Sequence, residues 1–307
     1  MGKNIKLSKN GNRLCSMFIF FTTFALKTMG RRLQNIRNRL SAYYEKGEAD
    51  AIGLILLDEL CGLSTADVLM GKDDELDDFE AEKVEKAMER LLQGEPIQYV
   101  VGKTRFCGLS IGVKPGVLIP RPETEELVEA ASQGHPASVL DIGTGSGCIA
   151  LALKHRFPHA DVTAMDISTY ALRIAQENAR ELGLDIRFVQ QNILEATPEP
   201  LKYDLIVSNP PYVCERERAQ MERHVLDYEP EQALFVPDSD PLLFYRTIIH
   251  YALTALKDQG TLAFETNREY AKAVGELMRE AGWCDVEVKK DLYNNERIVI
   301  GCLSRNL

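Results

Sequence analysis

The chain has 307 residues, of which 45% are hydrophobic and 27% charged, and its formal net charge is −10. This composition indicates a globular protein with one large domain and a small one, and the acidic balance argues against tight, non-specific binding of nucleic acid. The seven cysteines form no Cys-x-x-Cys pair and their number is odd, so neither a disulfide framework nor a zinc site is expected. We therefore expect a cytoplasmic protein without a metal.

The pattern of the first 28 residues is similar to that of a signal peptide. Four basic residues precede an apolar stretch over 14–26, which is shorter than the roughly 20 residues that a membrane-spanning helix needs. No small-x-small cleavage site follows it. We interpret residues 1–28 as an upstream extension, with Met29 as an alternative start, and expect no membrane contact. A membrane tether is the other interpretation.

Residues 29–96 are predicted to form a small helical domain. Apolar residues recur at helical spacing, as at Leu33, Ile36 and Leu40. The acidic run 73–78 is interpreted as a solvated loop and the start of a helix. The apolar stripes themselves predict packed helices and say nothing of a ligand.

Residues 97–116 are predicted to form a β-hairpin linker, because short β-rich runs are interrupted at Gly102 and Gly108. From 117 to 307, apolar strands alternate with helical patterns in the rhythm that builds a parallel sheet. The expected strands lie near 138–142, 162–166, 186–190, 204–208 and 260–265, and the expected helices near 147–156, 169–182, 241–257 and 268–281. Two further strands, 285–290 and 297–303, are predicted to form an antiparallel hairpin that turns at Asn294-Asn295.

A glycine-rich turn follows the first of these strands and precedes a helix. The turn consists of Gly143, Thr144, Gly145, Ser146 and Gly147. Its glycines permit positive φ and the close approach of a ligand to the backbone. No Lys-Ser or Lys-Thr pair follows, which excludes a Walker-type phosphate loop, and Cys148 stands where the dinucleotide fingerprint needs its third glycine. Asp166 ends the next strand, where an acidic side chain can bind a ribose diol.

A second loop, Asn209-Pro210-Pro211-Tyr212, follows the strand at 203–208. Ligands of open α/β sheets bind at the carboxyl ends of the strands. The two prolines have no N–H and stiffen the loop, while Asn209 offers an amide oxygen and Tyr212 an aromatic face. Two acceptors beside a flat ring suit a planar –NH2 group, either a carboxamide or the exocyclic amine of a base. The alternative is an ordinary rigid turn.

These motifs resemble the S-adenosylmethionine-dependent methyltransferases, and the second loop resembles those that methylate planar amino nitrogens. The segments 119–125, 93–99 and 228–235 resemble the release-factor glutamine methyltransferases in particular. The resemblance extends over residues 30–303. It implies an α/β fold with a Rossmann-like class I methyltransferase sheet over 117–307, a small N-terminal helical domain that positions the protein substrate, and a β-hairpin linker.

The resemblance also implies roles for individual residues. The turn 143–147 would border the methionine part of S-adenosylmethionine, Asp166 would hold the ribose hydroxyls, and Asn192 and Ile193 would border the adenine. Asn209 and the Pro210 carbonyl would accept hydrogen bonds from the substrate amide, with Pro211 in the same loop and Tyr212 packed on the amide plane. Asn209 would also border the cofactor. The substrate would be the glutamine of the Gly-Gly-Gln motif of peptide-chain release factors.

The chain departs from the family pattern at several places. The family has an aspartate, often followed by an aromatic residue, where this chain has Asn192-Ile193, and glycines where it has Val236-Pro237. A glycine-rich turn is also missing after Glu265. Three alternatives stay open: a ribosomal-protein glutamine methyltransferase, an adenine-N6 DNA methyltransferase, and a cofactor-binding scaffold without catalysis. The DNA enzyme would be expected to carry a basic recognition region, and no direct contact with nucleic acid is predicted here.

Overall fold

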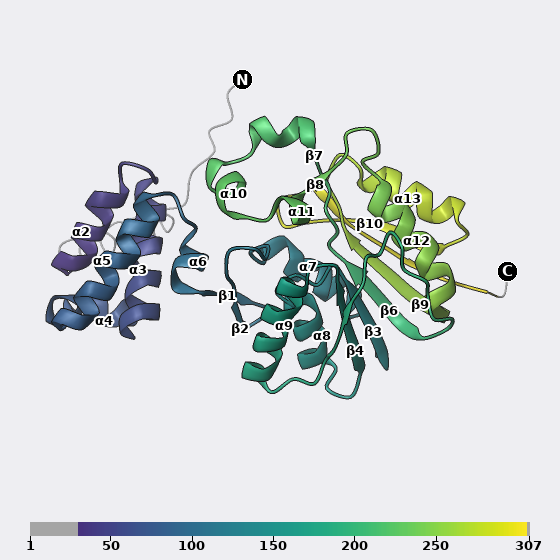
Figure 1. Ribbon diagram of the computed structural model, residues 1–307, viewed down its shortest axis with the longest axis horizontal. Coiled ribbons are helices and arrows are strands. Elements are labelled where there is room, and N and C mark those ends of the chain that lie inside the picture. Colours follow the sequence, from purple (N-terminus) through teal and green to yellow (C-terminus); the bar gives the residue numbers. More distant parts are fainter. Residues whose placement is uncertain (1–29, 306–307) are drawn as a thin grey trace, which may run out of the picture. The chain divides into compact units, whose positions relative to one another are not determined.

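The computed structural model describes residues 30–305, so the expectations for residues 1–28 lie outside the described part. The chain divides into two compact units, with the division between Val101 and Gly102. The first unit is helical and the second contains all the sheets of the described residues. Figure 1 labels most of the elements and colours the chain by sequence from purple to yellow.

The first unit consists of short helices around an apolar core. Its helices are α2 (Arg31–Leu40), α3 (Lys46–Cys61), α4 (Thr65–Leu69), η1 (Lys72–Glu75), α5 (Asp78–Leu92) and α6 (Ile97–Val101). Leu40, Leu56 and Met88 are fully buried at its centre. Helix α5 begins where Asp77 and Glu80 accept each other's backbone N–H groups, which satisfies donors that the first turn leaves unpaired.

One expectation for this unit is wrong in part. The acidic run 73–78 was expected to be solvated, but Asp73 is fully buried. Its carboxylate accepts the backbone N–H of Leu33, and Asp74 accepts that of Arg31. Helix α2 follows Gly30, which has no side chain to cap it, so acidic residues from elsewhere in the chain supply the acceptors for its first turn.

The second unit opens with the expected hairpin, in which β1 (Lys103–Phe106) pairs antiparallel with β2 (Leu109–Gly112). Residues 97–101, which were included in the predicted hairpin segment, form α6 instead. The turn uses positive φ at both Cys107 and Gly108, and glycine adopts this conformation without strain.

A seven-stranded sheet forms the centre of the second unit, in the order β10-β11-β9-β6-β3-β4-β5. The strands are β3 (Ser138–Ile142), β4 (Asp161–Asp166), β5 (Arg187–Gln190), β6 (Tyr203–Ser208), β9 (Leu256–Glu265), β10 (Cys284–Lys290) and β11 (Glu296–Cys302). Five strands are parallel, and β11 and β10 continue the sheet antiparallel. The predicted strands and the terminal hairpin are therefore confirmed, with β9 longer at its start than expected.

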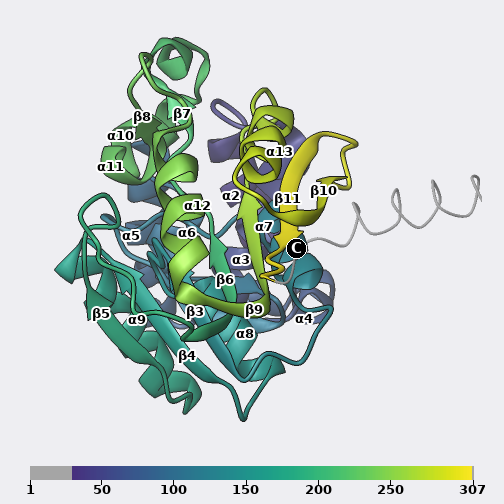
Figure 2. The same cartoon turned by 90° about the vertical axis from the view of Figure 1, so that its right-hand side faces the viewer.

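Helices cover both faces of this sheet (Figures 1 and 2). One face carries α7 (Pro122–Ala131), α8 (Cys148–Arg156) and α9 (Thr169–Leu182), and the other carries α12 (Leu243–Ala255) and α13 (Ala271–Glu280). Tyr245 of α12 meets Phe264 of β9 edge to face, with ring centroids 5.4 Å apart, and both rings are fully buried. This packing fixes the carboxyl end of β9 against α12.

Smaller elements fill the long connection between β6 and α12. They are β7 (Val213–Cys214), η2 (Glu215–Gln220), α10 (Arg223–Tyr228), α11 (Glu231–Leu234) and β8 (Phe235–Val236). Strands β7 and β8 pair in parallel. The end of the connection therefore lies next to its beginning, just after the loop Asn209–Tyr212. Figure 1 shows this connection in green, with α10 and α11 beside β7 and β8.

Candidate active site

The register of the sheet brings the two predicted loops to the same edge. In β3, Ile142 pairs with Met165 of β4 on one side and with Ser208 of β6 on the other. Each of these strands ends within one residue of that level, so the turn 143–147, Asp166 and Asn209 lie side by side. This edge is where ligands of open α/β sheets bind.

A cavity of about 270 Å³ opens at this edge. Of the predicted site residues, it is lined by Gly143, Gly145, Asp166, Asn192, Ile193, Asn209, Pro210 and Pro211. Other lining residues include Gly116, Val117 and Leu118 before α7, Ile167 and Ser168 after β4, and Pro230, Gln232 and Ala233 from α11 and the residue before it. The sequence analysis missed this second group, although the segment 228–235 was recognised as part of a motif.

The glycine turn lines the cavity with its backbone, whereas its two side chains are buried away from solvent. Gly143 and Gly145 have φ of 76° and 55°, and a Cβ at either position would have no atom within 4 Å. Thr144 and Ser146 are buried instead. Gly147 precedes α8, and a Cβ there would lie 2.9 Å from that of Ala175. The turn therefore leaves room for a ligand at its first two glycines and needs the third for packing against α9.

Asp141 anchors the turn from inside β3. Its Oδ2 accepts hydrogen bonds from Thr144 Oγ1 at 2.6 Å and from the backbone N of Ala150 at 3.2 Å. Burial raises the pKa of this carboxyl to about 7, although both hydrogen bonds act in the opposite direction. Its Oδ1 is buried and has no hydrogen-bond partner among the described residues. The sequence analysis gave Asp141 no role.

Asp166 reaches back across the same turn. Its Oδ2 accepts the backbone N–H of Gly145 at 2.9 Å, and its Oδ1 accepts that of Ser168 at 2.8 Å. Burial raises its pKa, and these hydrogen bonds lower it. An ionised carboxylate has about four acceptor positions, so some acceptor capacity remains for a hydroxyl group of a ligand. Ser168 is the N-cap of α9, because its hydroxyl accepts the N–H of Ala171.

Asn192 and Ile193 form the wall of the cavity beyond β5. The Asn192 side chain accepts the backbone N–H of Leu194 at 3.1 Å, so its amide oxygen is used within the loop. Ile193 packs in part against the buried core around β9 and α12. The wall offered to a flat ring at this point is aliphatic.

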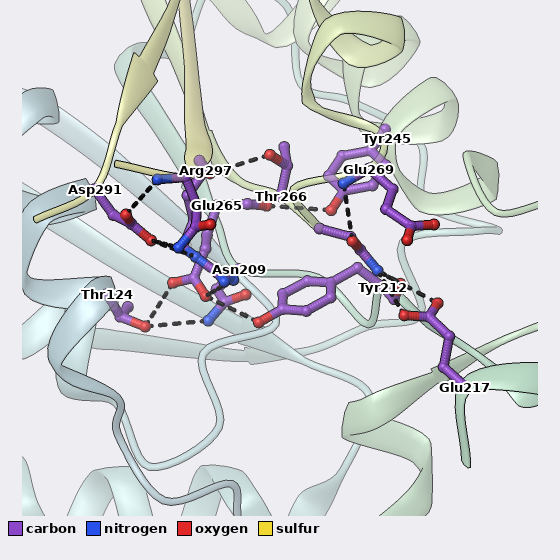
Figure 3. A network of polar contacts seen from close by, with 12 residues as sticks. Thr124, Asn209, Tyr212, Glu217, Tyr245, Glu265, Thr266, Glu269, Asp291 and Arg297 are labelled. Carbon is purple, nitrogen blue, oxygen red and sulfur yellow. Dashed lines mark hydrogen bonds and ion pairs between the residues drawn. The ribbon is translucent and has the colours of Figure 1, made fainter. Parts of the chain in front are cut away.

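Asn209 is half-buried at the opposite wall, and Figure 3 shows it within a network of polar side chains. Its Nδ2 donates to Thr124 Oγ1 at 3.3 Å. Tyr212 donates from its hydroxyl to Glu265 Oε1 at 3.0 Å, and burial raises its pKa. Tyr212 is not among the residues that line the cavity. Its packing on a substrate amide therefore stays a prediction.

The partners of this loop come from distant parts of the chain. Thr124 donates to Glu265 Oε2 at 2.6 Å, Arg297 Nη1 lies 4.0 Å from Glu265 Oε1, and Arg297 Nε pairs with Asp291 at 3.2 Å. Glu265 is the last residue of β9 and is 1% exposed. The rule that singled out Asp166, an acidic residue at a strand's carboxyl end, would also have found Glu265.

Comparison with known proteins agrees with this fold. Residues 32–102 match the PrmC N-terminal domain and residues 122–228 the Methyltransferase small domain. The structure is similar to that of a methyltransferase from Pyrococcus furiosus, with a TM-score of 0.50 and 19% identity over 64% of this chain and 90% of that one. The fold is that of the class I S-adenosylmethionine-dependent methyltransferases. Within the described residues, no helix is both long and apolar enough to span a membrane.

The relatives that are similar in sequence show to which family of methyltransferases the chain belongs. The chain is 43% identical over 274 residues to the release factor glutamine methyltransferase of Bacteroides thetaiotaomicron, which covers 88% of this chain and 99% of the relative. It is 40% identical over 267 residues to that of Flavobacterium psychrophilum, with 85% and 94% covered. The same name is carried by a relative from Enterococcus faecalis, 37% identical over 278 residues. The chain belongs to the release factor glutamine methyltransferase family.

Proposed function

We propose that this protein transfers a methyl group from S-adenosylmethionine to the side-chain amide nitrogen (N5) of the glutamine in the Gly-Gly-Gln motif of peptide-chain release factors. The observation that carries this proposal is that Asn209 and Pro210 line the same cavity as Gly143, Gly145 and Asp166. A cofactor site and an acceptor of flat –NH2 groups thus share one space. The names of the relatives support the choice of substrate.

The residues present fit this cofactor. Space is open at Gly143 and Gly145, where a Cβ would meet nothing within 4 Å, and the methionine part would lie along their backbone. Asp166 keeps acceptor capacity that would be directed to the ribose hydroxyls. Asn192 and Ile193 would border the adenine, with aliphatic contact in place of an aromatic stack. When bound, the cofactor supplies a methyl group that its positive sulfonium has already activated.

The protein's own part in the reaction is alignment. Asn209 Oδ1 and the Pro210 carbonyl would accept both N–H groups of the glutamine amide and so turn its nitrogen toward the methyl group. Tyr212 would support the amide plane from the side. The new N–C bond forms as the S–C bond breaks, and the methylated nitrogen, which is then strongly acidic, releases one proton to solvent. A general base is therefore not required, and neither histidine nor lysine is needed at this loop.

Selectivity for an amide follows from the same groups. A lysine ammonium carries three donors and has no plane, so two fixed acceptors leave one of its donors unpaired. A glutamine that follows two glycines has little bulk beside it and can enter a narrow cavity. The helical unit, which matches the PrmC N-terminal domain over residues 32–102, would position the release factor. We place the reaction in the cytoplasm, which the free cysteines of the described part support.

The decisive experiment offers labelled cofactor to three acceptors. They are a release factor, the same factor with its Gly-Gly-Gln glutamine changed to alanine, and duplex DNA. Label is expected on the first alone. Label on ribosomal protein in a parallel reaction, or on DNA, would instead support one of the alternative substrates. Equal labelling of the alanine variant would refute the glutamine as acceptor.

A further inference from the structure

The buried carboxylate of Glu265 is the origin of a directed chain of hydrogen bonds (Figure 3). It accepts the hydroxyl protons of Thr124 at 2.6 Å and of Tyr212 at 3.0 Å. Burial raises the pKa of this carboxyl, while the hydrogen bonds from Thr124 and Tyr212 and the nearby Arg297, which Asp291 holds in place, stabilise its ionised form. An ionised carboxylate accepts hydrogen bonds and cannot donate them. Both hydroxyl groups must therefore point their protons at Glu265.

This direction fixes what Thr124 can offer to Asn209. The Thr124 hydroxyl has one proton, and it donates that proton in its hydrogen bond to Glu265. Toward any other neighbour, the Thr124 oxygen can therefore only accept a hydrogen bond. Asn209 approaches the same oxygen at 3.3 Å. Only the amide nitrogen of Asn209 can donate to an acceptor, so it faces Thr124. Its Oδ1 lies in the same carboxamide plane but on the other side of Cγ, and it therefore points away from Thr124.

The alternative orientation of Asn209 would defeat the proposed chemistry. With the amide turned over, its –NH2 would face the –NH2 of the substrate, and two donors form no hydrogen bond. The side chain alone does not choose between the two orientations, since oxygen and nitrogen have nearly the same shape. Thr124 is 2% exposed and Glu265 is 1% exposed, so water does not compete for the hydrogen bonds that make the choice.

We infer that Thr124 and Glu265 are positioning residues: Glu265 orients the Thr124 hydroxyl, which holds Asn209 with its oxygen toward the substrate amide. This inference rests on the proposed function and adds two residues to it. The same carboxylate also holds Tyr212 through its other oxygen. One buried group thereby fixes both ends of the loop Asn209–Tyr212.

The test compares Thr124→Val with Thr124→Ser. Valine keeps the shape of threonine and removes its hydroxyl, whereas serine keeps the hydroxyl. Thr124→Val is expected to lower kcat toward a release factor by about 100-fold, the scale found when a reacting group loses its alignment. Affinity for S-adenosylmethionine should stay unchanged, and Thr124→Ser should restore turnover. A variant that was merely less stable would lose cofactor affinity together with kcat, so a lower kcat at unchanged cofactor affinity indicates a positioning role.

Thr266→Val is the matched control. Thr266 is fully buried beside Glu265, and its hydroxyl donates to the backbone O of Arg297 at 3.1 Å, outside the chain of bonds that leads to Asn209. This variant should keep wild-type turnover. If Thr124→Val fails to fold, Glu265→Gln decides the question, because glutamine keeps the shape of the side chain but has one acceptor oxygen for two hydroxyl donors, so one end of the loop Asn209–Tyr212 loses its hydrogen bond. It too should lose turnover and keep cofactor affinity.

The experiments distinguish a failure of the proposed function from a failure of the positioning role of Thr124 and Glu265. A wild-type protein that leaves the release-factor glutamine unmethylated would refute the proposed function. A wild type that methylates it, together with a folded Thr124→Val or Glu265→Gln variant of normal turnover, would refute the positioning role alone.

Discussion

Arg121 and Glu229 stand 108 positions apart, and Arg121 Nη2 lies 2.5 Å from Glu229 Oε1. The carboxylate of Glu229 is completely buried, and its Oε2 accepts the backbone N–H of Ile119 at 3.1 Å. The pair joins the segment before α7 to the segment before α11. Both segments line the cavity, through Leu118 and Pro230 among others, so this contact holds two of its walls together.

Glu229→Ala should therefore lower both stability and cofactor affinity. The change leaves the Ile119 N–H and the Arg121 guanidinium without their partner, which we expect to cost about 1–3 kcal/mol. Thermal unfolding and calorimetric titration with S-adenosylmethionine would measure the two effects. Glu231→Ala, which removes an exposed carboxylate that pairs with Arg218, is the control and should change neither. A Glu229→Ala protein with unchanged melting and affinity would show that the walls are held by other contacts.

Asp166→Ala should weaken the binding of S-adenosylmethionine. Charge-assisted hydrogen bonds to the ribose hydroxyls contribute about 1.5–3 kcal/mol, and the variant also releases Gly145, whose N–H the carboxylate accepts. Asp161→Ala, at the exposed opposite end of the same strand, provides the comparison. Calorimetry that finds equal affinity in the two variants would remove Asp166 from the site.

Asn209→Ala should abolish most methyl transfer while the fold persists. The loss of a preorganised hydrogen-bonding group at a reacting centre costs about 2.7–4 kcal/mol, by analogy with oxyanion-hole donors. Single-turnover rates with saturating cofactor would measure it, and the circular dichroism and melting temperature should match those of the wild type. Near-normal rates would mean that another group holds the substrate amide.

Asp141 should make stability depend on pH. Its pKa is raised by burial to about 7 in the folded protein, whereas an aspartate in an unfolded chain has a pKa of about 3.9. Between these values the folded state binds more protons than the unfolded state, so the free energy of unfolding falls as pH rises. In the absence of cofactor, the melting temperature of the wild type minus that of Asp141→Asn should therefore fall between about pH 4 and pH 7. A difference that does not vary with pH would contradict the raised pKa.

The regular elements of the second unit could be predicted because their signals are local. Apolar runs of strand length, glycines and a serine cap mark the ends of the strands and helices around 138–182, and the structure has them within a few residues. The rule for strand ends then predicts that the two loops meet. The register that brings them level, with Ile142 opposite Ser208, is consistent with the buried apolar residues of both strands, which favour particular registers.

Other features depend on partners that the sequence does not reveal. Thr124 and Glu265 are 141 positions apart, and the residues next to them in the sequence do not indicate that they are in contact. Asp73 lies in a run of charge that indicates solvent, yet the first turn of α2 requires its carboxylate. Strands β7 and β8 have two residues each, too few for any periodicity, so their pairing is decided by the tertiary structure.

The adjacency of β3 and β6 has a consequence for how the reaction distance is set. Neighbouring strands lie about 4.8 Å apart, at a spacing that backbone hydrogen bonds maintain. The proposed donor site starts at the end of β3 and the proposed acceptor site at the end of β6, at the same level of the ladder. The distance between the two reactants is thus set by the spacing of these two paired strands, and no closing lid is needed to define it. Substitutions that shift the pairing of β3 with β6 should therefore slow catalysis even when every side chain at the site is kept.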